Sequence, residues 1–316
     1  MSLPPTFLLT ANQSSNESDR AVLGVERLVL VAVLGSEVVL GVTGNSLLIY
    51  TKIRLSQCRR ELHSQYVIAL LSLSVSDLGC CLLIMSSSLL AVLMEGERSP
   101  WCEIVSLLKF AFITSSLGSL AILCVQRCVG VASTGSWKTV VVVIACITSW
   151  VTGLVFGSVP VVFQWIRYDP AEMLCAVFWQ DSYSDMLLYI LSAFSLCIFT
   201  PLLIIIVCSL LTSAGLSQNC GDEDLSSVTP LLVAVYFLCY TPFVLSELIL
   251  LGRLDLSPAP DWLRTLSSVM AYLDCVLNPL IYCTNQDFRE AVLGVLWTNR
   301  KAKVQPVLTS VVRLQV

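Results

Sequence analysis

Charge is scarce in this 316-residue sequence: 13% of its residues are Asp, Glu, Lys or Arg, and 56% are hydrophobic. A soluble domain typically has roughly 25% charged residues, so this composition fits a soluble fold poorly. The sequence also lacks a basic stripe with interleaved aromatic residues, which argues against nucleic-acid binding. Its only histidine is His63, and no catalytic or Cys/His metal-ligand pattern is present. We therefore expect neither an enzyme nor a transition-metal site.

Long hydrophobic runs take the place of the missing charge. Each predicted span reaches the roughly 20 residues that a helix needs to cross a bilayer core of about 30 Å. These spans cover residues 28–51, 65–93, 103–125, 139–163, 186–213, 228–252 and 263–283. The sequence predicts an all-α membrane protein with a seven-transmembrane helix bundle over 28–283, between a tail at 1–27 and a segment at 284–316. Within that last segment, residues 286–297 have an apolar face, which predicts a short amphipathic helix on the inner leaflet.

The polar tail at the start of the chain holds two glycosylation sequons, at Asn12 and Asn16, which favour an extracellular N-terminus. No basic segment followed by an apolar core begins the chain, so we expect no cleaved signal peptide. Seven crossings then place the C-terminus in the cytoplasm, and the excess of Lys and Arg in the inner segments agrees. Cys102 and Cys175 both fall on the outer, oxidising side, where a disulfide between them is plausible.

Polar or helix-breaking residues recur inside the spans, with a marker in each. They are Gly44-Asn45, Ser76-Asp77, Arg127, Trp150 with Pro160, Pro201, Tyr236 to Pro242, and Asn278-Pro279 with Tyr282, followed by Asp287-Phe288-Arg289. In this order the set resembles a rhodopsin-like (class A) G-protein-coupled receptor over about residues 28–297. In that family the outer cysteine and inner arginine of the third helix lie 25 residues apart, as Cys102 and Arg127 do here.

The resemblance implies a plasma-membrane receptor that passes an extracellular signal to a heterotrimeric G protein, to arrestin or to both. It implies a Cys102–Cys175 disulfide, and it places Arg127 in the G-protein interface. Pro242 and Pro279 each remove a backbone hydrogen bond, so we expect them to kink their helices and act as hinges. Tyr282 belongs to the same set of switch residues.

Lys109 is a full charge in an otherwise uncharged stretch, where a charge is costly unless paired or hydrated. It lies seven residues after Cys102, seven before Ser116 and 18 before Arg127, so all four share one helix face. The resemblance implies that this face points into the bundle and that Lys109 lies at ligand-pocket depth, where amine receptors have an aspartate. A monoamine ligand is then disfavoured, and an anionic group is favoured.

Other partners remain open for Lys109. An internal ion pair with Glu247, another with Glu37, or snorkelling of the side chain would each accommodate the charge. Tyr240, Tyr272 and Phe110 are further candidates for the pocket lining, although aromatic residues at such positions are often plain packing.

A carboxylate near mid-bilayer, Asp77, also needs partners. The resemblance groups Asp77, Ser116, Asp274 and Asn278 around one polar cavity, with Asn45 close by, where related receptors often hold a sodium ion. Oxygen ligands and negative charge suit a hard cation. Asp274 replaces the family's usual asparagine, so two arrangements stay open: a cation site, or two carboxylates that share a proton.

Several positions depart from the family pattern. The inner end of the third helix reads Gln126-Arg127-Cys128 instead of acidic-Arg-aromatic, so Gln126 cannot restrain Arg127 by an ion pair and basal activity is expected to rise. Asp222 or Glu223 offers an alternative restraint. Tyr240 replaces the switch tryptophan of the sixth helix, and the third inner loop, about 212–227, has no basic residue.

These departures motivate an alternative function, a receptor relative that does not signal conventionally and acts in trafficking, heteromerisation or ligand scavenging. A transporter is disfavoured because the sequence shows no internal repeats or matching broken helices. A light-sensing opsin needs a lysine in the seventh span for its Schiff base, and residues 263–283 contain none.

Overall fold

The computed structural model describes residues 5–59, 65–94, 101–129, 136–177, 183–216, 223–252 and 258–298. Within these ranges it describes the side chains except those of residues 5–23, 55–59, 65, 136–137, 183–184, 223–227, 251, 287 and 295–298. The helices are α1 (Pro5–Arg59), α2 (Gln65–Gly79), α3 (Ser86–Leu93), α4 (Cys102–Val129), α5 (Ser136–Val162), α6 (Tyr183–Ala193), α7 (Thr200–Ser213), α8 (Glu223–Gly252), α9 (Asp261–Tyr282) and α10 (Gln286–Thr298). The strands are β1 (Ile166–Asp169) and β2 (Leu174–Val177). Two π-helical segments, η2 (Cys80–Met85) and η3 (Phe194–Phe199), join α2 to α3 and α6 to α7.

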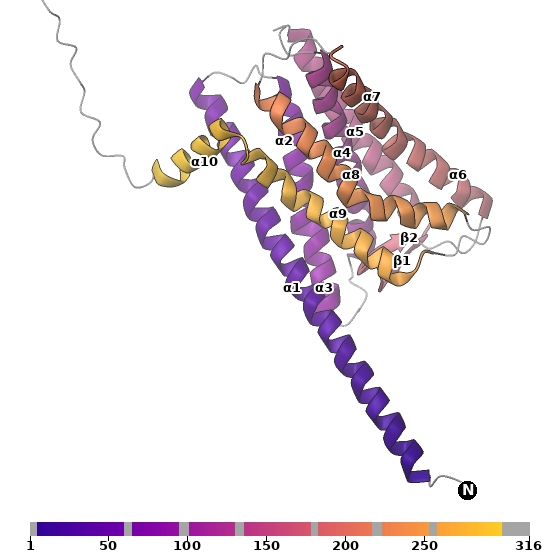
Figure 1. Ribbon diagram of the computed structural model, residues 1–316. Helices are drawn as coiled ribbons and strands as arrows, with labels where there is room; N and C mark the ends of the chain where they lie inside the picture. The colour runs from indigo at the N-terminus through magenta and orange to yellow at the C-terminus, as the bar shows by residue number, and fades with distance from the viewer. Residues whose placement is uncertain are drawn as a thin grey trace, which may run out of the picture.

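The rods α1, α2–η2–α3, α4, α5, α6–η3–α7, α8 and α9 lie side by side and form the predicted seven-helix bundle (Figure 1). Among the described residues, five rods have the length and apolar composition of membrane spans: 66–93, 102–129, 138–162, 185–213 and 228–250. The rods α1 and α9 complete the bundle, and α9 is less apolar because it carries Asp261, Arg264 and Asp274. Helix α10 follows α9 and packs against α1.

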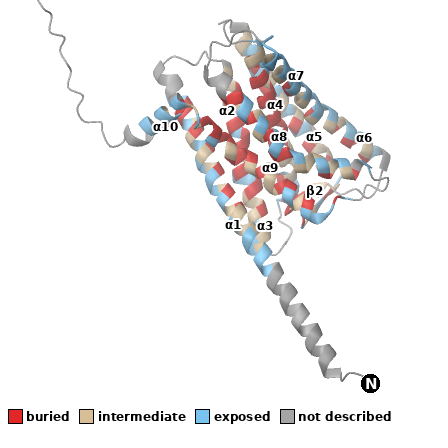
Figure 2. Cartoon of the chain, viewed as in Figure 1, coloured by how far each residue is buried: buried red, intermediate tan, exposed pale blue. Residues whose placement is uncertain are grey.

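The bundle is buried at its centre and apolar at its periphery (Figure 2). Helix α5 exposes Ile144 and Ile147, and α7 exposes Leu203 and Leu210. Soluble monomers rarely expose contiguous apolar surface on this scale. In a bilayer the acyl chains cover it, so the exposed faces agree with a membrane-spanning chain.

Prolines and π-helical segments interrupt the regular hydrogen bonding of several rods. Pro201 is the second residue of α7, which follows η3, and it has no N–H to offer the preceding turn. Thr200 donates its hydroxyl to the carbonyl of Ser195, at 2.7 Å, and Ser86 does the same for Cys81 at 3.1 Å. Side-chain hydroxyls thus add hydrogen bonds to carbonyls at the irregular segments, and the Ser195 carbonyl also accepts the backbone N–H of Thr200.

Strands β1 and β2 pair antiparallel in a short hairpin at the end of the bundle where α4 begins, which the predicted topology makes the outer end. The predicted disulfide is present: Cys102 at the start of α4 is bonded to Cys175 in β2, with 5.5 Å between their Cα atoms. The disulfide ties the hairpin to the outer end of α4, the helix at the centre of the bundle, which packs against α2, α5 and α7.

Helices α4 and α5 approach so closely that glycine is required on α5. A Cβ atom on Gly153 would lie 2.8 Å from the Cα atom of Ala111, and one on Gly157 would lie 2.7 Å from the carbonyl oxygen of Leu107. Neither neighbour is a flexible side chain that can move aside, because both contacts are with α4 backbone. The distance between these two helices therefore depends on the missing side chains.

We predict that Gly153→Leu destabilises the bundle by about 3 kcal/mol or more, because overpacking forces α4 and α5 apart. The matched control is Gly35→Leu in α1, where an added Cβ meets nothing within 4 Å. Thermal unfolding of the purified protein and its level at the cell surface measure the effect. Equal stability of the two variants would refute the packing argument.

Candidate functional site

Lys109 projects from α4 toward the outer hairpin and forms an ion pair with Glu172, with 2.9 Å between Nζ and Oε2. The side chains are about 19% and 22% exposed, so water screens the pair only partly. Glu172 lies in the turn between β1 and β2. The alternatives considered from the sequence, Glu247 and Glu37, make no ion pair with Lys109. The partner is instead a loop residue 63 positions away, which the sequence analysis missed.

A signal for this pairing was present in the chain. Glu172 precedes the disulfide cysteine Cys175 by three residues, and Lys109 follows Cys102 by seven. Seven residues of helix span about 10 Å, which is within reach of a hairpin turn that starts at the disulfide. The disulfide therefore places the carboxylate of Glu172 at the depth of Lys109.

A second cation holds the same turn on its other side. Arg264 of α9 pairs with Asp169 at the end of β1 and with Asp261 at 2.8 Å. The hydroxyl of Thr265 donates to the carbonyl oxygen of Ala171 at 2.7 Å, and the backbone N–H of Ala171 donates to Asp169 at 2.9 Å. The turn is thus bound to both α4 and α9, and it closes the outer end of the bundle between them.

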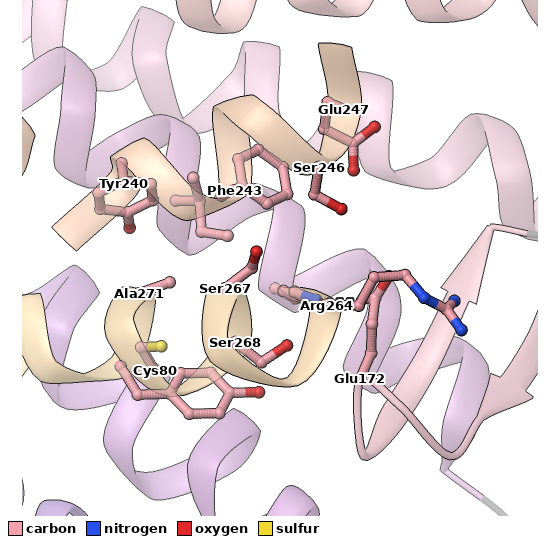
Figure 3. Close-up of a pocket in the computed structure, with 13 residues that line it drawn as sticks. Cys80, Glu172, Tyr240, Phe243, Ser246, Glu247, Arg264, Ser267, Ser268 and Ala271 are labelled. Atoms are coloured by element: carbon pink, nitrogen blue, oxygen red, sulfur yellow. Dashed lines mark hydrogen bonds and ion pairs between the residues drawn. The ribbon is translucent and has the colours of Figure 1, made fainter. Parts of the chain in front are cut away.

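Below the turn lies a small cavity of about 30 Å³ (Figure 3). Its lining includes Lys109, Glu172, Tyr240, Glu247, Arg264 and Tyr272, together with Ser246, Ser267 and Ser268. In Figure 3, Glu247 and Ser246 on α8 face Ser267 and Ser268 on α9, with Arg264 beside Glu172. A cavity of this volume has room for roughly two water molecules.

A larger cavity of about 230 Å³ lies against the hairpin and the outer ends of α8 and α9, and shares Glu172, Ser246, Glu247 and Arg264 with the small one. Four of the predicted pocket residues line the small cavity: Lys109, Glu247, Tyr240 and Tyr272. Phe110 does not join them. It packs against the Tyr189–Ile190–Ala193 cluster of α6, because one residue along a helix turns the side chain by about 100°.

Burial raises the pKa of Glu172, but the positive charge of Lys109 and the hydrogen bond that Lys109 donates lower this pKa by more. The charge of Arg264 lowers it further. The pKa of Glu172 is therefore held below its ordinary value of 4.5. A carboxyl group with a lowered pKa stabilises the fold above its ordinary pKa, and the contribution is lost as the pH falls through the lowered value. At neutral pH Glu172 is therefore ionised, and its ion pair with Lys109 binds the turn to α4.

Deeper in the bundle, Asp77 of α2 is the centre of a buried polar cluster. Its Oδ1 accepts from the hydroxyl of Ser116 at 3.1 Å, and its Oδ2 accepts from the amide of Asn278 at 2.9 Å. The amide of Asn45 donates to the carbonyl of Cys275 at 2.9 Å. These contacts bring α1, α2, α4 and α9 together at the predicted place.

Asp274 lies within electrostatic range of Asp77 and beside the amide of Asn278. Its Oδ1 is buried and has no hydrogen-bond partner among the described residues. The cluster thus supplies two carboxylates, a hydroxyl and amide oxygens, a donor set that fits a hard monovalent cation. The same geometry fits two carboxyl groups that share a proton.

At the inner end of α4, the side chain of Gln126 is buried, and neither Nε2 nor Oε1 has a partner among the described residues. Tyr282 at the end of α9 is also buried and packs edge-on against Phe288 of α10, with ring centroids 6.2 Å apart. Pro242 and Pro279 lie inside α8 and α9. The side chains of Asn12, Asn16 and Glu223 and all of Asp222 lie outside what the structure describes.

Comparison with known proteins identifies the class. The family "7 transmembrane receptor (rhodopsin family)" matches residues 44–282, and the chain belongs to that family. It is thus a multi-pass G-protein-coupled receptor of the plasma membrane and not an enzyme.

Similar proteins come from several branches of this family. The C5a anaphylatoxin chemotactic receptor 1 of Danio rerio is 25% identical over 306 residues, which cover 90% of this chain and 85% of that receptor. Pinopsin of Columba livia is 27% identical and covers 87% of this chain and 81% of its own. The crystal structure of squid rhodopsin has the same fold, with a TM-score of 0.68 at 18% identity, over 89% of this chain and 88% of that one.

The Lys109–Glu172 pair predicts unequal effects of removing its two members. Glu172→Gln leaves Lys109 near a second acidic side chain, Glu247, whereas Lys109→Met leaves Glu172 and Glu247 with Arg264 as the remaining cation of the cavity. We expect a loss of about 1 kcal/mol for Glu172→Gln and about 3 kcal/mol for Lys109→Met.

Thermal unfolding of purified protein at neutral pH measures both losses. Asp261→Asn is the control, because the Asp261 carboxylate is 84% exposed and its ion pair is largely screened. A larger loss for Glu172→Gln than for Lys109→Met would contradict the prediction.

Proposed function

We propose that this receptor responds to a ligand that presents an anionic group, and that Lys109 binds this group in the outer cavity. The observation that carries the proposal is the Lys109–Glu172 pair. A carboxylate of the protein already occupies the place beside Lys109, and Arg264 adds a second cation at the same cavity. A ligand carboxylate or phosphate matches this arrangement in charge and in hydrogen-bonding capacity.

Binding would act by exchange. A ligand anion that replaces Glu172 beside Lys109 releases the hairpin turn from α4, while Glu247 on α8 faces the incoming charge. The same cavity is lined by Tyr240, two residues before Pro242, so the exchange acts on the part of α8 next to its proline. Differential binding to the two arrangements of α8 then shifts the equilibrium between receptor states.

The ligand classes of several relatives fit this cavity less well. The relatives include opsins and an alpha-1A adrenergic receptor. Helix α9 has no lysine for a retinal Schiff base, and Lys109 repels a cationic amine. Two further relatives are named as receptors for the anaphylatoxins C5a and C3a. A peptide ligand with a free C-terminal carboxylate would supply the required anion.

Three further assignments belong to the proposal. The N-terminus is extracellular and glycosylated at Asn12 and Asn16, and the C-terminus is cytoplasmic. Arrestin is a second intracellular partner beside the G protein, with Arg127 at the interface. A sodium ion binds between Asp77 and Asp274 as an allosteric modulator, supported by the partnerless Oδ1 of Asp274.

A second candidate function is favoured by Gln126. Gln126 is a neutral amide, so it supplies no ionic restraint for the neighbouring Arg127. Either the receptor signals without ligand, or it has lost conventional coupling and acts in trafficking, heteromerisation or scavenging. Signalling assays distinguish the two.

We predict high basal output from the wild type across a panel of G-protein and arrestin reporters at matched surface expression. Gln126→Asp should lower it severalfold by adding an acidic partner for Arg127, and Arg127→Glu should abolish it. In the same assay, carboxylic acids should act on the wild type and lose activity on Lys109→Ala, whereas their methyl esters should be inactive on both. If neither the wild type nor any variant gives a reporter signal despite normal surface levels, the non-signalling function is favoured.

The two arrangements of Asp77 and Asp274, a cation site and a shared proton, differ in whether the protein responds to sodium. We predict that NaCl raises the melting temperature of the purified receptor relative to choline chloride at equal ionic strength. Asp77→Asn should remove the effect, and Asp274→Asn should lower the apparent sodium affinity about tenfold, equivalent to about 1.4 kcal/mol. A melting temperature that is independent of sodium but changes with pH would indicate that Asp77 and Asp274 share a proton instead.

A further inference from the structure

Besides the two cysteines of the Cys102–Cys175 disulfide, the structure describes ten cysteines, and these differ in exposure. Seven of the ten are buried, and three are partly exposed: Cys128, Cys208 and Cys283. A thiol reacts with a solute only where the solute can reach it, so these three are the described thiols most accessible to a small oxidant. Cys128 is the second-last residue of α4, and Cys208 lies five residues before the end of α7.

The packing of α4 against α7 brings Cys128 and Cys208 together. Ile205 of α7 is fully buried, in the same core cluster as Cys124 of α4. Cys208 follows Ile205 by three residues, so both lie on one side of α7. Cys128 follows Cys124 by four residues, so both lie on one side of α4. The side chains of Cys128 and Cys208 are accordingly in hydrogen-bonding contact, about one turn beyond the buried residues.

A second pair of neighbouring thiols lies deeper in the bundle and provides a comparison. Cys275 of α9 is in hydrogen-bonding contact with Cys80 of η2. Both belong to a core cluster, and they are only 4% and 6% exposed. Of the two pairs, only Cys128 and Cys208 combine contact between the thiols with exposure of both.

We propose that Cys128 and Cys208 are a peroxide-sensitive thiol pair, which hydrogen peroxide converts to a disulfide that links α4 to α7. Both lie near the helix ends that the proposed topology places in the cytoplasm, where thiols are kept reduced, and both are reduced in this structure. Disulfides that form in the cytosol are usually transient, and many serve in redox sensing. A pair of accessible, contacting thiols that is reduced at rest fits that behaviour.

The reaction needs no group beyond the two thiols and the peroxide. The thiolate of one cysteine attacks the O–O bond, which forms a sulfenic acid and releases hydroxide that takes up a proton. The thiolate of the other cysteine then attacks the sulfenic sulfur, forms the S–S bond and expels a second hydroxide, which also becomes water. The two thiols lose two electrons and the peroxide gains them, so one peroxide yields one disulfide and two waters. Glutathione reverses the step by thiol–disulfide exchange.

The disulfide would join two residues that are 80 positions apart in the chain, because 208 minus 128 is 80. A disulfide has an S–S distance of about 2.05 Å, so the bond would hold the inner end of α7 closer to α4 than the hydrogen-bonding contact does. Arg127 directly precedes Cys128. The bond would therefore also restrain α7 relative to the residue at the partner interface, a consequence that, unlike the disulfide itself, rests on the proposed function.

The test treats cells that express the full-length receptor with hydrogen peroxide, at a dose that oxidises the cytosolic peroxiredoxins of the same cells. Remaining thiols are then blocked with N-ethylmaleimide, and disulfide-linked peptides are mapped by mass spectrometry. We expect a link between Cys128 and Cys208 that is absent from untreated cells and lost after dithiothreitol. Cys80 and Cys275 should stay unlinked at the same dose because they are buried.

Thermal unfolding provides a second readout, since a cross-link between two helices restrains their separation. The peroxide-treated, purified receptor should melt at a higher temperature than the reduced receptor, and dithiothreitol should reverse the rise. Cys208→Ser should lose both the linked peptide and the rise. The control is Cys283→Ser, which removes another partly exposed thiol and should keep both. Surface expression of each untreated variant shows that it folds.

Two results would overturn the proposal. One is the absence of the link between Cys128 and Cys208 at the chosen dose, including the case in which Cys128 is linked to Cys58 or Cys220 instead. The other is an equal rise in melting temperature for the wild type and Cys208→Ser, which would mean that oxidation elsewhere stabilises the receptor. Neither readout depends on signalling or on an anionic ligand, so this proposal and the proposed function fail separately.

Discussion

An ionic group inside a bilayer needs a partner, and the outer half of this bundle is organised around that requirement at Lys109. Helix α4 places the ammonium group at a depth that water does not reach freely. The disulfide between Cys102 and Cys175 brings the hairpin to the same depth, and Glu172 at its turn supplies the compensating charge. Arg264 then fixes the other side of the turn through Asp169. The closed outer end of the receptor therefore depends on the pairing of Lys109 with a carboxylate.

The same requirement separates two kinds of polar group deeper in the membrane. Asp77 is matched by Ser116 and Asn278, and these contacts hold helices together. The Oδ1 atom of Asp274 and the amide of Gln126 are buried without such partners among the described residues. The satisfied groups explain part of the fold, whereas the Oδ1 atom of Asp274 supports the proposed sodium site.

The fold was predictable from sequence because most of the spans are recognisable by length and apolar composition, and because lipid leaves a helix few alternatives. The face shared by Cys102, Lys109 and Ser116 was predictable too, because helical periodicity fixes which residues align. The partner of Lys109 was not, because Glu172 lies in a loop whose path depends on a disulfide and on Arg264. Phe110 was assigned to the pocket by proximity in sequence, but one step along the helix turned it toward α6.

The hairpin carboxylate has a consequence for any free anion that approaches Lys109. Glu172 is tethered at both ends of its turn, so it competes as an intramolecular ligand whose effective concentration is at least in the millimolar range. A small anion with a single contact to Lys109 cannot displace it at micromolar concentration. Selectivity thus comes from the tether as well as from the pocket: only a molecule that gains further contacts, with α8, α9 or the outer cavity, outcompetes a carboxylate that never diffuses away.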